Sequence, residues 1–148
     1  MSFGWAEQLG SLGIVVLTAL LCSVIHYNFL KRLNDGFRLT IEYPRMRLLL
    51  GVIVALIAHS IEVALFALAY ALSIHAGHGQ LVGSFDGTIG DYLYFSYAAF
   101  TTVGFGDVVA TGLIRLLAGV EALTGFVLIT WTASYLYLEM TRLWQIKS

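Results

Sequence analysis

The sequence predicts an all-α membrane protein in which three helices cross the membrane and a fourth, shorter helix enters it without crossing. Of its 148 residues, 59% are hydrophobic and only 11% are charged. Soluble domains carry about 25% charged residues, so this chain needs lipid to cover its apolar surface. Its apolar residues also gather in three long runs, as membrane-spanning helices require.

The length, net charge and cysteine content of the chain narrow the possible classes of protein further. The length suits one membrane unit, and the formal net charge of −1 argues against a nucleic-acid partner. The single cysteine, Cys22, lies inside an apolar run, so an intramolecular disulfide is excluded.

Residues 1–47 form the first predicted unit, an N-terminal transmembrane helix followed by a basic loop. The helix is expected over Leu12 to Leu30, a run without charged residues. At 1.5 Å per residue it spans about 28 Å, close to the hydrocarbon thickness of a bilayer. A signal peptide is the alternative, but no Lys or Arg precedes the run and its apolar core is too long. The loop runs from Lys31 to Arg47, and Asn34-Asp35-Gly36 is expected to form a turn within it.

Residues 48–148 form the second predicted unit. It contains an outer helix over residues 48–74 and an inner helix over residues 112–140, each long enough to cross the membrane with some tilt. Between them, residues 75–90 are rich in glycine and lack Lys and Arg, which predicts a solvent-exposed loop.

The distribution of basic residues predicts the orientation. Five Lys or Arg residues lie between Lys31 and Arg47 and two follow Leu138, whereas none precedes Leu12 and none lies in residues 75–111. By the positive-inside rule, the basic segments face the cytoplasm. The N-terminus is therefore expected outside and the C-terminus in the cytoplasm.

A short aromatic segment, residues 91–101, precedes the third span. As a helix it would measure only about 16 Å, too short to cross a bilayer. We expect a re-entrant helix that descends from the outer face, with Asp91 capping its first turn. The negative end of its dipole would then point toward the membrane centre, which favours a cation there.

The stretch Thr101-Thr102-Val103-Gly104-Phe105-Gly106-Asp107 follows this helix. Each of its two glycines disfavours a helix interior by roughly 1 kcal/mol relative to alanine, and an isolated strand with open edges is not tolerated in hydrocarbon. Glycine does allow positive φ angles, which turn successive carbonyl groups to one side. Rings of such carbonyls from several chains can replace the water around a cation, so we expect the backbone itself to be the working surface.

These seven residues, between a short aromatic helix and a long apolar one, resemble the pore signature of potassium channels. The resemblance covers residues 48–140 and is closest to small bacterial members of the two-transmembrane-pore ion channel family, here with one extra N-terminal helix. The run from Arg115 to Gly125 is also similar to the inner helix of that family. The resemblance implies a passive, K⁺-selective channel, not an enzyme, with its selectivity filter at residues 102–107.

Carried onto this sequence, the resemblance implies rings of backbone carbonyls that bind dehydrated K⁺, contributed by Thr102, Val103, Gly104 and Phe105. The Thr102 hydroxyl would form the innermost ring, Gly106 would let the chain leave the filter, and Thr101 would support it. Asp107 would lie behind the outer end and accept a hydrogen bond from Tyr94, at the position where the family usually has Trp. K⁺ is the implied ion, and no organic cofactor is implied.

The sequence departs from the family pattern at two places. Phe105 stands where most members have Tyr, and the proline common shortly after the filter is absent from Val108-Val109-Ala110. Two alternative functions remain open at this point: a weakly selective monovalent cation channel, and a non-conducting regulatory subunit with a vestigial filter.

Each chain carries one filter segment, which cannot surround an ion by itself. Fourfold closure requires four chains, so geometry and the resemblance together predict a homotetramer; a dimer would need two filters per chain. The resemblance also implies a bacterial plasma membrane. The basic segment Lys31–Arg47 is explained by orientation alone, and binding of anionic lipid is a second interpretation of it.

The third span contains a candidate hinge and gate. Gly125 lies near its middle, where a small residue either permits bending or lets another helix pack closely. Four residues beyond it share one face at helical spacing, and an apolar ring there would stop ions by dewetting: Phe126, Ile129, Ala133 and Tyr137.

His59, Glu62 and Glu121 are ionisable residues within the predicted spans. His59 and Glu62 lie one turn apart on one face, and Glu121 lies within about 10 Å of the same depth. Because ionisable groups in a membrane normally face protein or water, we expect a buried polar cluster that orients the outer and inner helices. A proton sensor that biases the gate is the second interpretation.

Overall fold

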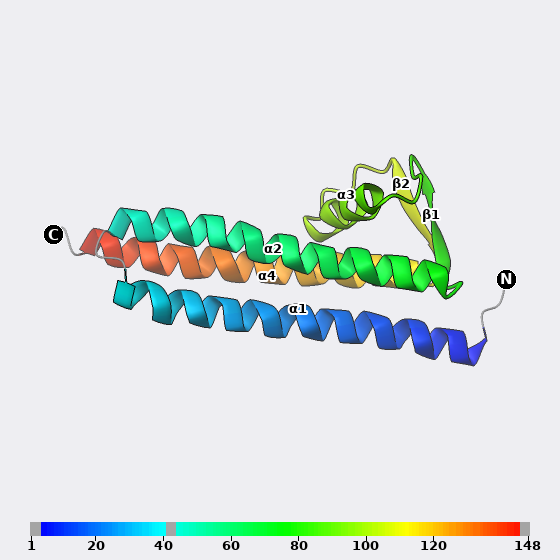
Figure 1. Ribbon diagram of the computed structural model, residues 1–148, viewed down its shortest axis with the longest axis horizontal. Coiled ribbons are helices and arrows are strands. Elements are labelled where there is room, and N and C mark those ends of the chain that lie inside the picture. The colour runs from blue at the N-terminus through cyan, green and yellow to red at the C-terminus, as the bar shows by residue number, and fades with distance from the viewer. Residues whose placement is uncertain (1–3, 41–43, 146–148) are drawn as a thin grey trace.

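The computed structural model describes residues 4–40 and 44–145 of the chain. Three long helices lie side by side along the long axis of the molecule (Figure 1), namely α1 (Trp5–Thr40), α2 (Pro44–His75) and α4 (Ile114–Gln145). Within the described residues, each contains a stretch long and apolar enough to cross a membrane. The mostly helical fold with three candidate spans confirms the predicted fold class.

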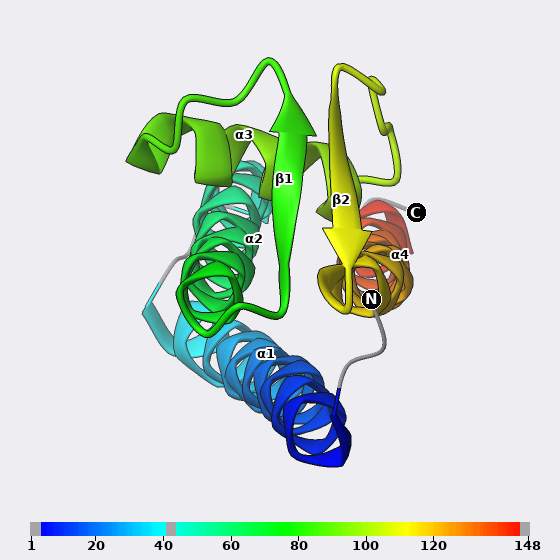
Figure 2. The same cartoon turned by 90° about the vertical axis from the view of Figure 1, so that its right-hand side faces the viewer.

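The connection between α2 and α4 folds back over one end of these two helices. It consists of β1 (Gly79–Gly83), α3 (Ile89–Phe100) and β2 (Val108–Gly112). The end-on view in Figure 2 shows α3 and the strands on one side of the α2–α4 pair and α1 on the other. Helix α1 therefore packs along α2 and α4, away from the segment between α3 and β2.

The two strands were not predicted from the sequence. They pair in antiparallel register, with Leu81 opposite Ala110 and Val82 opposite Val109. Residues 75–90 are thus not simply an exposed loop, because Leu81 is buried together with Val108 of the partner strand. Both strands are short and lie far apart in the sequence, so neither has a local pattern that distinguishes it from a loop. Since β2 extends to Gly112, α4 begins at Ile114 instead of residue 112.

The turn expected at Asn34-Asp35-Gly36 is wrong, because α1 continues through it to Thr40. Adding residues to a helix that already exists is far easier than nucleating one, so three weak helix formers do not stop it. The 36 residues of α1 would measure about 54 Å, longer than the hydrocarbon core. The first part of the predicted basic loop is therefore a helical extension. Residues 41–43 lie outside the described part of the chain.

The apolar core lies where α2, α3 and α4 meet. Tyr70 and Phe66 of α2 pack against aromatic residues of α3: the Tyr70 and Phe95 ring centroids are 5.0 Å apart, and those of Phe66 and Phe100 are 6.4 Å apart. All four side chains are buried. Aromatic pairs of this kind contribute about 0.5–1.5 kcal/mol beyond the burial of their area, so they help to hold α3 in place.

Candidate functional site

The first turn of α3 is closed by a capping box. Thr88, the residue before the helix, accepts a hydrogen bond from the Asp91 N–H at 3.2 Å, and the Asp91 carboxylate accepts one from the Thr88 N–H at 3.0 Å. The hydrogen bond from the Thr88 N–H lowers the pKa of Asp91. The Thr88 hydroxyl group and the Asp86 N–H lower it further. The expected capping by Asp91 is present, and the N-cap residue is Thr88, with which Asp91 forms the reciprocal pair.

A buried hydrogen-bond network fixes the middle of α3. Ser96 Oγ lies 2.8 Å from the Val63 carbonyl oxygen on α2 and also hydrogen bonds to the Glu121 carboxyl group on α4. Tyr70 Oη of α2 donates to the same carboxyl group at 2.5 Å. Leaving one member of such a network unpaired costs about 1–3 kcal/mol, so these bonds tie α3 firmly to both long helices.

The end of α3 lies directly against α4 at Gly125. A Cβ atom at this position would be 2.0 Å from the Phe100 carbonyl oxygen and 2.9 Å from Cγ of the Phe100 ring. No L-side chain fits there without movement of the backbone. Of the two interpretations of Gly125, close helix packing therefore explains the residue in this structure, where α4 is helical on both sides of it.

The backbone after α3 has an alternating conformation. Thr102, Gly104 and Gly106 have positive φ angles of 60°, 54° and 84°. Val103 and Phe105, which stand between them, do not have positive φ angles. Alternating between the two hands of backbone conformation turns successive peptide groups the same way. A positive φ is a genuine outlier for the β-branched Thr102, and such strain concentrates at functional sites.

Hydrogen bonds to the carbonyl groups of α3 hold the beginning of this stretch. The Thr102 N–H donates to the Ala99 carbonyl at 3.0 Å, and the Gly104 N–H donates to the Ala98 carbonyl at 3.1 Å. Thr101, the residue after the helix, donates its hydroxyl proton to the Tyr97 carbonyl at 2.7 Å. The last turn of α3 therefore uses its free carbonyl groups to position the first half of the predicted filter, residues 102–107.

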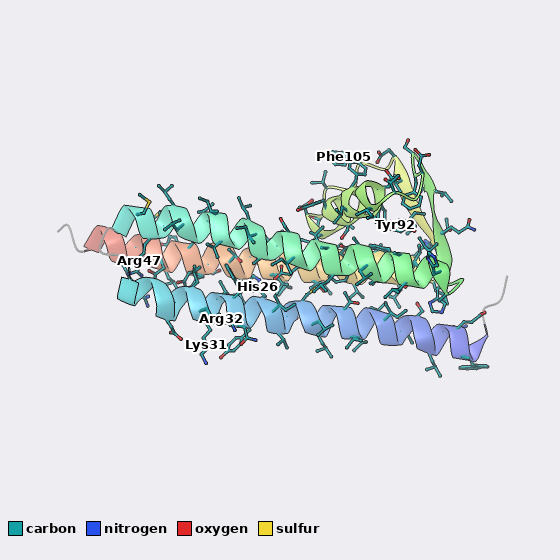
Figure 3. All side chains as sticks on the ribbon, in the orientation of Figure 1. His26, Lys31, Arg32, Arg47, Tyr92 and Phe105 are labelled. Carbon is teal, nitrogen blue, oxygen red and sulfur yellow. The ribbon has the colours of Figure 1, made fainter. Side chains whose placement is uncertain are left out.

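Two side chains of the predicted filter are exposed in a single chain. Val103 and Phe105 are 56% and 67% exposed, and Figure 3 shows Phe105 projecting on the side of α3 away from the three long helices. Phe105 stacks on Tyr94 of α3, with ring centroids 5.9 Å apart and planes at 10°. One chain thus presents one wall of a site and leaves the opposite side open.

Tyr94 also holds Asp107, the residue that follows the predicted filter glycine Gly106. Its hydroxyl group donates to Asp107 Oδ2 at 2.9 Å, as the resemblance implies, and this hydrogen bond raises the pKa of Tyr94. On the other side of Asp107, its carbonyl oxygen accepts the Ser84 N–H at 3.0 Å and lies 2.0 Å from where a Cβ of Gly83 would be. The end of β1, which sequence reasoning missed, thus contacts Asp107 at the end of the predicted filter.

Tyr94→Phe is expected to loosen the outer end of the filter without unfolding the protein. The substitution keeps the ring stacked on Phe105 and removes only the hydrogen bond to Asp107, which is worth about 1 kcal/mol. Reversal potentials in mixed K⁺ and Na⁺ should show a several-fold loss of cation discrimination. Tyr92→Phe is the matched control, because Tyr92 packs its ring on Phe85 and this contact survives the change. Equal selectivity in the two variants would contradict a supporting role for Tyr94.

The predicted polar cluster of the spans is divided in two. His59 Nδ1 lies 2.8 Å from Glu62 Oε2, as expected for residues one turn apart. Glu121 bonds instead to Tyr70 and Ser96. Depth along a helix can be estimated from the sequence, but rotation about the helix axis cannot, and the two carboxyl groups face different neighbours.

His26 on α1 is the member that sequence reasoning missed. Its Nδ1 lies 2.9 Å from Glu62 Oε1, and both side chains are completely buried. The available signal was an ionisable residue within an otherwise uncharged apolar run, which is costly in a membrane unless it is paired.

Three basic residues from residues 31–47 lie toward the end of the bundle away from Phe105 (Figure 3), whereas Arg115 lies beside Gly106 and Asp107. In Figure 3, Lys31 and Arg32 project from α1 away from α2 and α4, and Arg47 lies near the far end of the bundle. Arg47 forms a salt bridge with Glu139 of α4, which also binds Arg142 at 2.7 Å. Of the basic segment, Arg47 is therefore engaged within the protein, whereas Lys31 and Arg32 are exposed.

These features define a class of membrane protein. A capped helix too short to cross the bilayer is followed by a stretch of strained, exposed backbone. Along the sequence, one long apolar helix precedes these two segments and another follows them. This is the architecture of a pore loop. A sequence profile of a protein family described as "Ion channel" matches residues 53–142, more than half of the chain. The chain therefore belongs to this family of ion channels, and not to a class of enzymes. Among curated proteins, no match to the chain was found.

Proposed function

We propose that this ion channel is K⁺-selective and conducts K⁺ passively at the fourfold axis of a homotetramer. The observation that carries the proposal is the alternation of positive φ at Thr102, Gly104 and Gly106. Successive carbonyls turned to one side form stacked rings when several chains meet, and such rings replace the hydration shell of K⁺. The carbonyls of residues 102–105 are the proposed ligands, with the Thr102 hydroxyl as the innermost ring.

The exposed filter face supports assembly around an axis. Val103 and Phe105 present apolar surface that one chain does not cover, and backbone of this kind at membrane depth is tolerated only where protein buries it or water lines it. Four chains would satisfy both conditions, since neighbouring copies cover the sides and the carbonyls face a central file of ions.

The distribution of charge supports an orientation. The basic residues Lys31, Arg32 and Arg47 lie away from Phe105 along the bundle (Figure 3). By the positive-inside rule, we propose that this end is cytoplasmic and that the filter faces outward, in a bacterial plasma membrane. Anionic lipid is a proposed partner of Lys31 and Arg32.

The exposed face of α4 beyond Gly125 is the proposed gate. Phe126 and Tyr137 are 58% and 60% exposed in a single chain, and Ile129 lies on the same face at 36%; Ala133 is exposed between them. In a tetramer, four copies of such an apolar face would surround the ion path below the filter and close it by dewetting.

Cation flux from the purified full chain tests the proposal. The protein, reconstituted in vesicles of phosphatidylethanolamine and phosphatidylglycerol, is given outward K⁺ or Na⁺ gradients, and flux is followed with a potential-sensitive dye. We expect K⁺ flux and no measurable Na⁺ flux, and a particle mass in detergent close to four times 16.2 kDa after correction for bound detergent.

Each other outcome contradicts a specific part of the proposal. Equal K⁺ and Na⁺ flux would identify a weakly selective cation channel, the first alternative. Absence of flux from a folded tetramer would identify a non-conducting subunit. A folded particle of any other stoichiometry would overturn the fourfold site.

A further inference from the structure

The cluster of His26, His59 and Glu62 lies outside the proposed ion path. His26 projects from α1, whereas His59 and Glu62 project from α2, and Thr132 of α4 completes the group. The side chains of His26 and Glu62 are completely buried, and that of His59 is 16% exposed. Three helices thus direct polar side chains at one point in the apolar interior.

The donor atoms have the composition and spacing of a transition-metal site. One ligand atom from each of the three residues lies within 4.8 Å of the others. The two histidine Nδ1 atoms are 2.9 and 2.8 Å from the two carboxylate oxygens of Glu62. In a tetrahedral Zn²⁺ site, donors about 2.0–2.1 Å from the ion lie about 3.3 Å from one another. Small side-chain rotations would convert the observed arrangement into such a site.

The positions of the outer nitrogens favour a metal over a simple hydrogen-bonded contact. Both Nε2 atoms approach the same hydroxyl group, Thr132 Oγ1, at 3.3 and 3.2 Å. A hydroxyl accepts two hydrogen bonds but donates only one. If Nδ1 of each ring binds a metal, both Nε2 atoms carry protons and Thr132 accepts both bonds, the arrangement typical of metal-bound histidines.

Without a metal, the hydrogen-bonding atoms of these four side chains cannot all find a partner within the group. The Glu62 carboxylate is an acceptor, so both Nδ1 atoms must donate to it and both neutral rings then present Nε2 as an acceptor. Thr132 has one proton for two such atoms, so one Nε2 atom is left without a hydrogen-bond donor.

We propose that His26, His59 and Glu62 bind a divalent transition ion of the Zn²⁺ class, with Thr132 orienting both histidines, and that the ion joins α1 to the pore-forming helices. The Glu62 carboxylate offsets one of its two charges, and water fills the fourth position. The ion reaches the site past His59, the member with an exposed edge. The site would hold α1 against α2 and α4, so metal would stabilise the packing of the N-terminal helix.

Metal binding to the purified full chain tests this site independently of ion flux. The chain is stripped with chelator, and Zn²⁺ binding is measured by calorimetry and Co²⁺ binding by its visible absorption, between pH 6 and 8. We expect one ion per chain and a tetrahedral Co²⁺ spectrum.

Variants separate the metal site from a structural contact. His26→Gln keeps a polar side chain but removes the ligand, and should abolish the Co²⁺ spectrum. His26→Cys should restore it, since a thiolate also binds Zn²⁺ and Co²⁺. Thr132→Val should weaken binding by about 10–100-fold, as expected for a group that orients ligands. His75→Ala, at an exposed position outside the cluster, is the control and should bind like the wild type.

Two results would overturn the proposal. One is less than a tenth of an ion per wild-type chain, and the other is equal binding by the wild type and His26→Gln; either would leave a hydrogen-bonded contact between helices. If His26→Gln does not assemble, the Thr132→Val and His75→Ala measurements still decide the question.

Discussion

Gly125→Ala is expected to displace the re-entrant helix, abolish ion flux and destabilise the protein. Its Cβ would lie 2.0 Å from the Phe100 carbonyl oxygen, a distance that no side-chain rotation relieves because the backbone fixes the positions of both atoms. Overpacking of a core generally costs about 1–3 kcal/mol, and a clash with backbone belongs at the upper end of this range or above. Thermal unfolding in detergent and K⁺ flux in vesicles measure the two effects.

Gly119→Ala is the matched control for this substitution. Gly119 lies on the same helix, and a Cβ there meets nothing within 4 Å in the chain. Alanine is favoured over glycine inside a helix by roughly 1 kcal/mol, so this variant should be as stable as the wild type or slightly more stable. A Gly125→Ala channel with normal flux and stability would show that α3 and α4 are farther apart than described.

Gly104→Ala is expected to remove K⁺ flux while leaving most of the fold intact. Gly104 has a φ of +54°, and a Cβ there meets nothing within 4 Å in the chain, so the effect comes from backbone conformation and not from a clash within the chain. The left-handed conformation costs an L-residue roughly 1–2 kcal/mol. Relaxation to a negative φ would turn one carbonyl away from the proposed ion path in every copy.

Gly87→Ala provides the control for backbone strain alone. Gly87 also has a positive φ, +81°, in open space, but it lies before α3 and outside the filter. Both variants should unfold at similar temperatures, slightly below the wild type, and only Gly104→Ala should lose K⁺ flux. Equal flux in the two variants would contradict a role for the Gly104 conformation in conduction.

Much of the fold could be predicted because the membrane restricts what a sequence can do. Hydrocarbon requires long apolar helices, and their lengths and charges can be counted directly. The short segment before Thr101 was assigned to a re-entrant helix on the same ground, because about eleven residues cannot cross. The two glycines of the predicted filter, Gly104 and Gly106, indicate positive φ, which the structure has at both.

The errors have a common physical origin in contacts between distant segments. The β1–β2 pair joins residues on either side of α3. The turn expected at residues 34–36 is the exception, because propagation of the α1 helix overrides it. Glu121 faces Ser96 and His26 faces Glu62. Which neighbour each side chain meets depends on how its helix is rotated against the others. None of these is encoded within a short window of sequence.

By itself, the sequence determined that this is a membrane protein with three spans, one short re-entrant helix and a glycine-containing segment suited to expose its carbonyls. Composition, segment length and the conformational freedom of glycine are enough for that. Only the tertiary structure decided that Gly125 packs directly against Phe100, that the end of a two-stranded sheet contacts Asp107, and that His26 joins His59 and Glu62. These depend on how helices rotate and approach one another, because side chains from separate helices meet only after the bundle has formed.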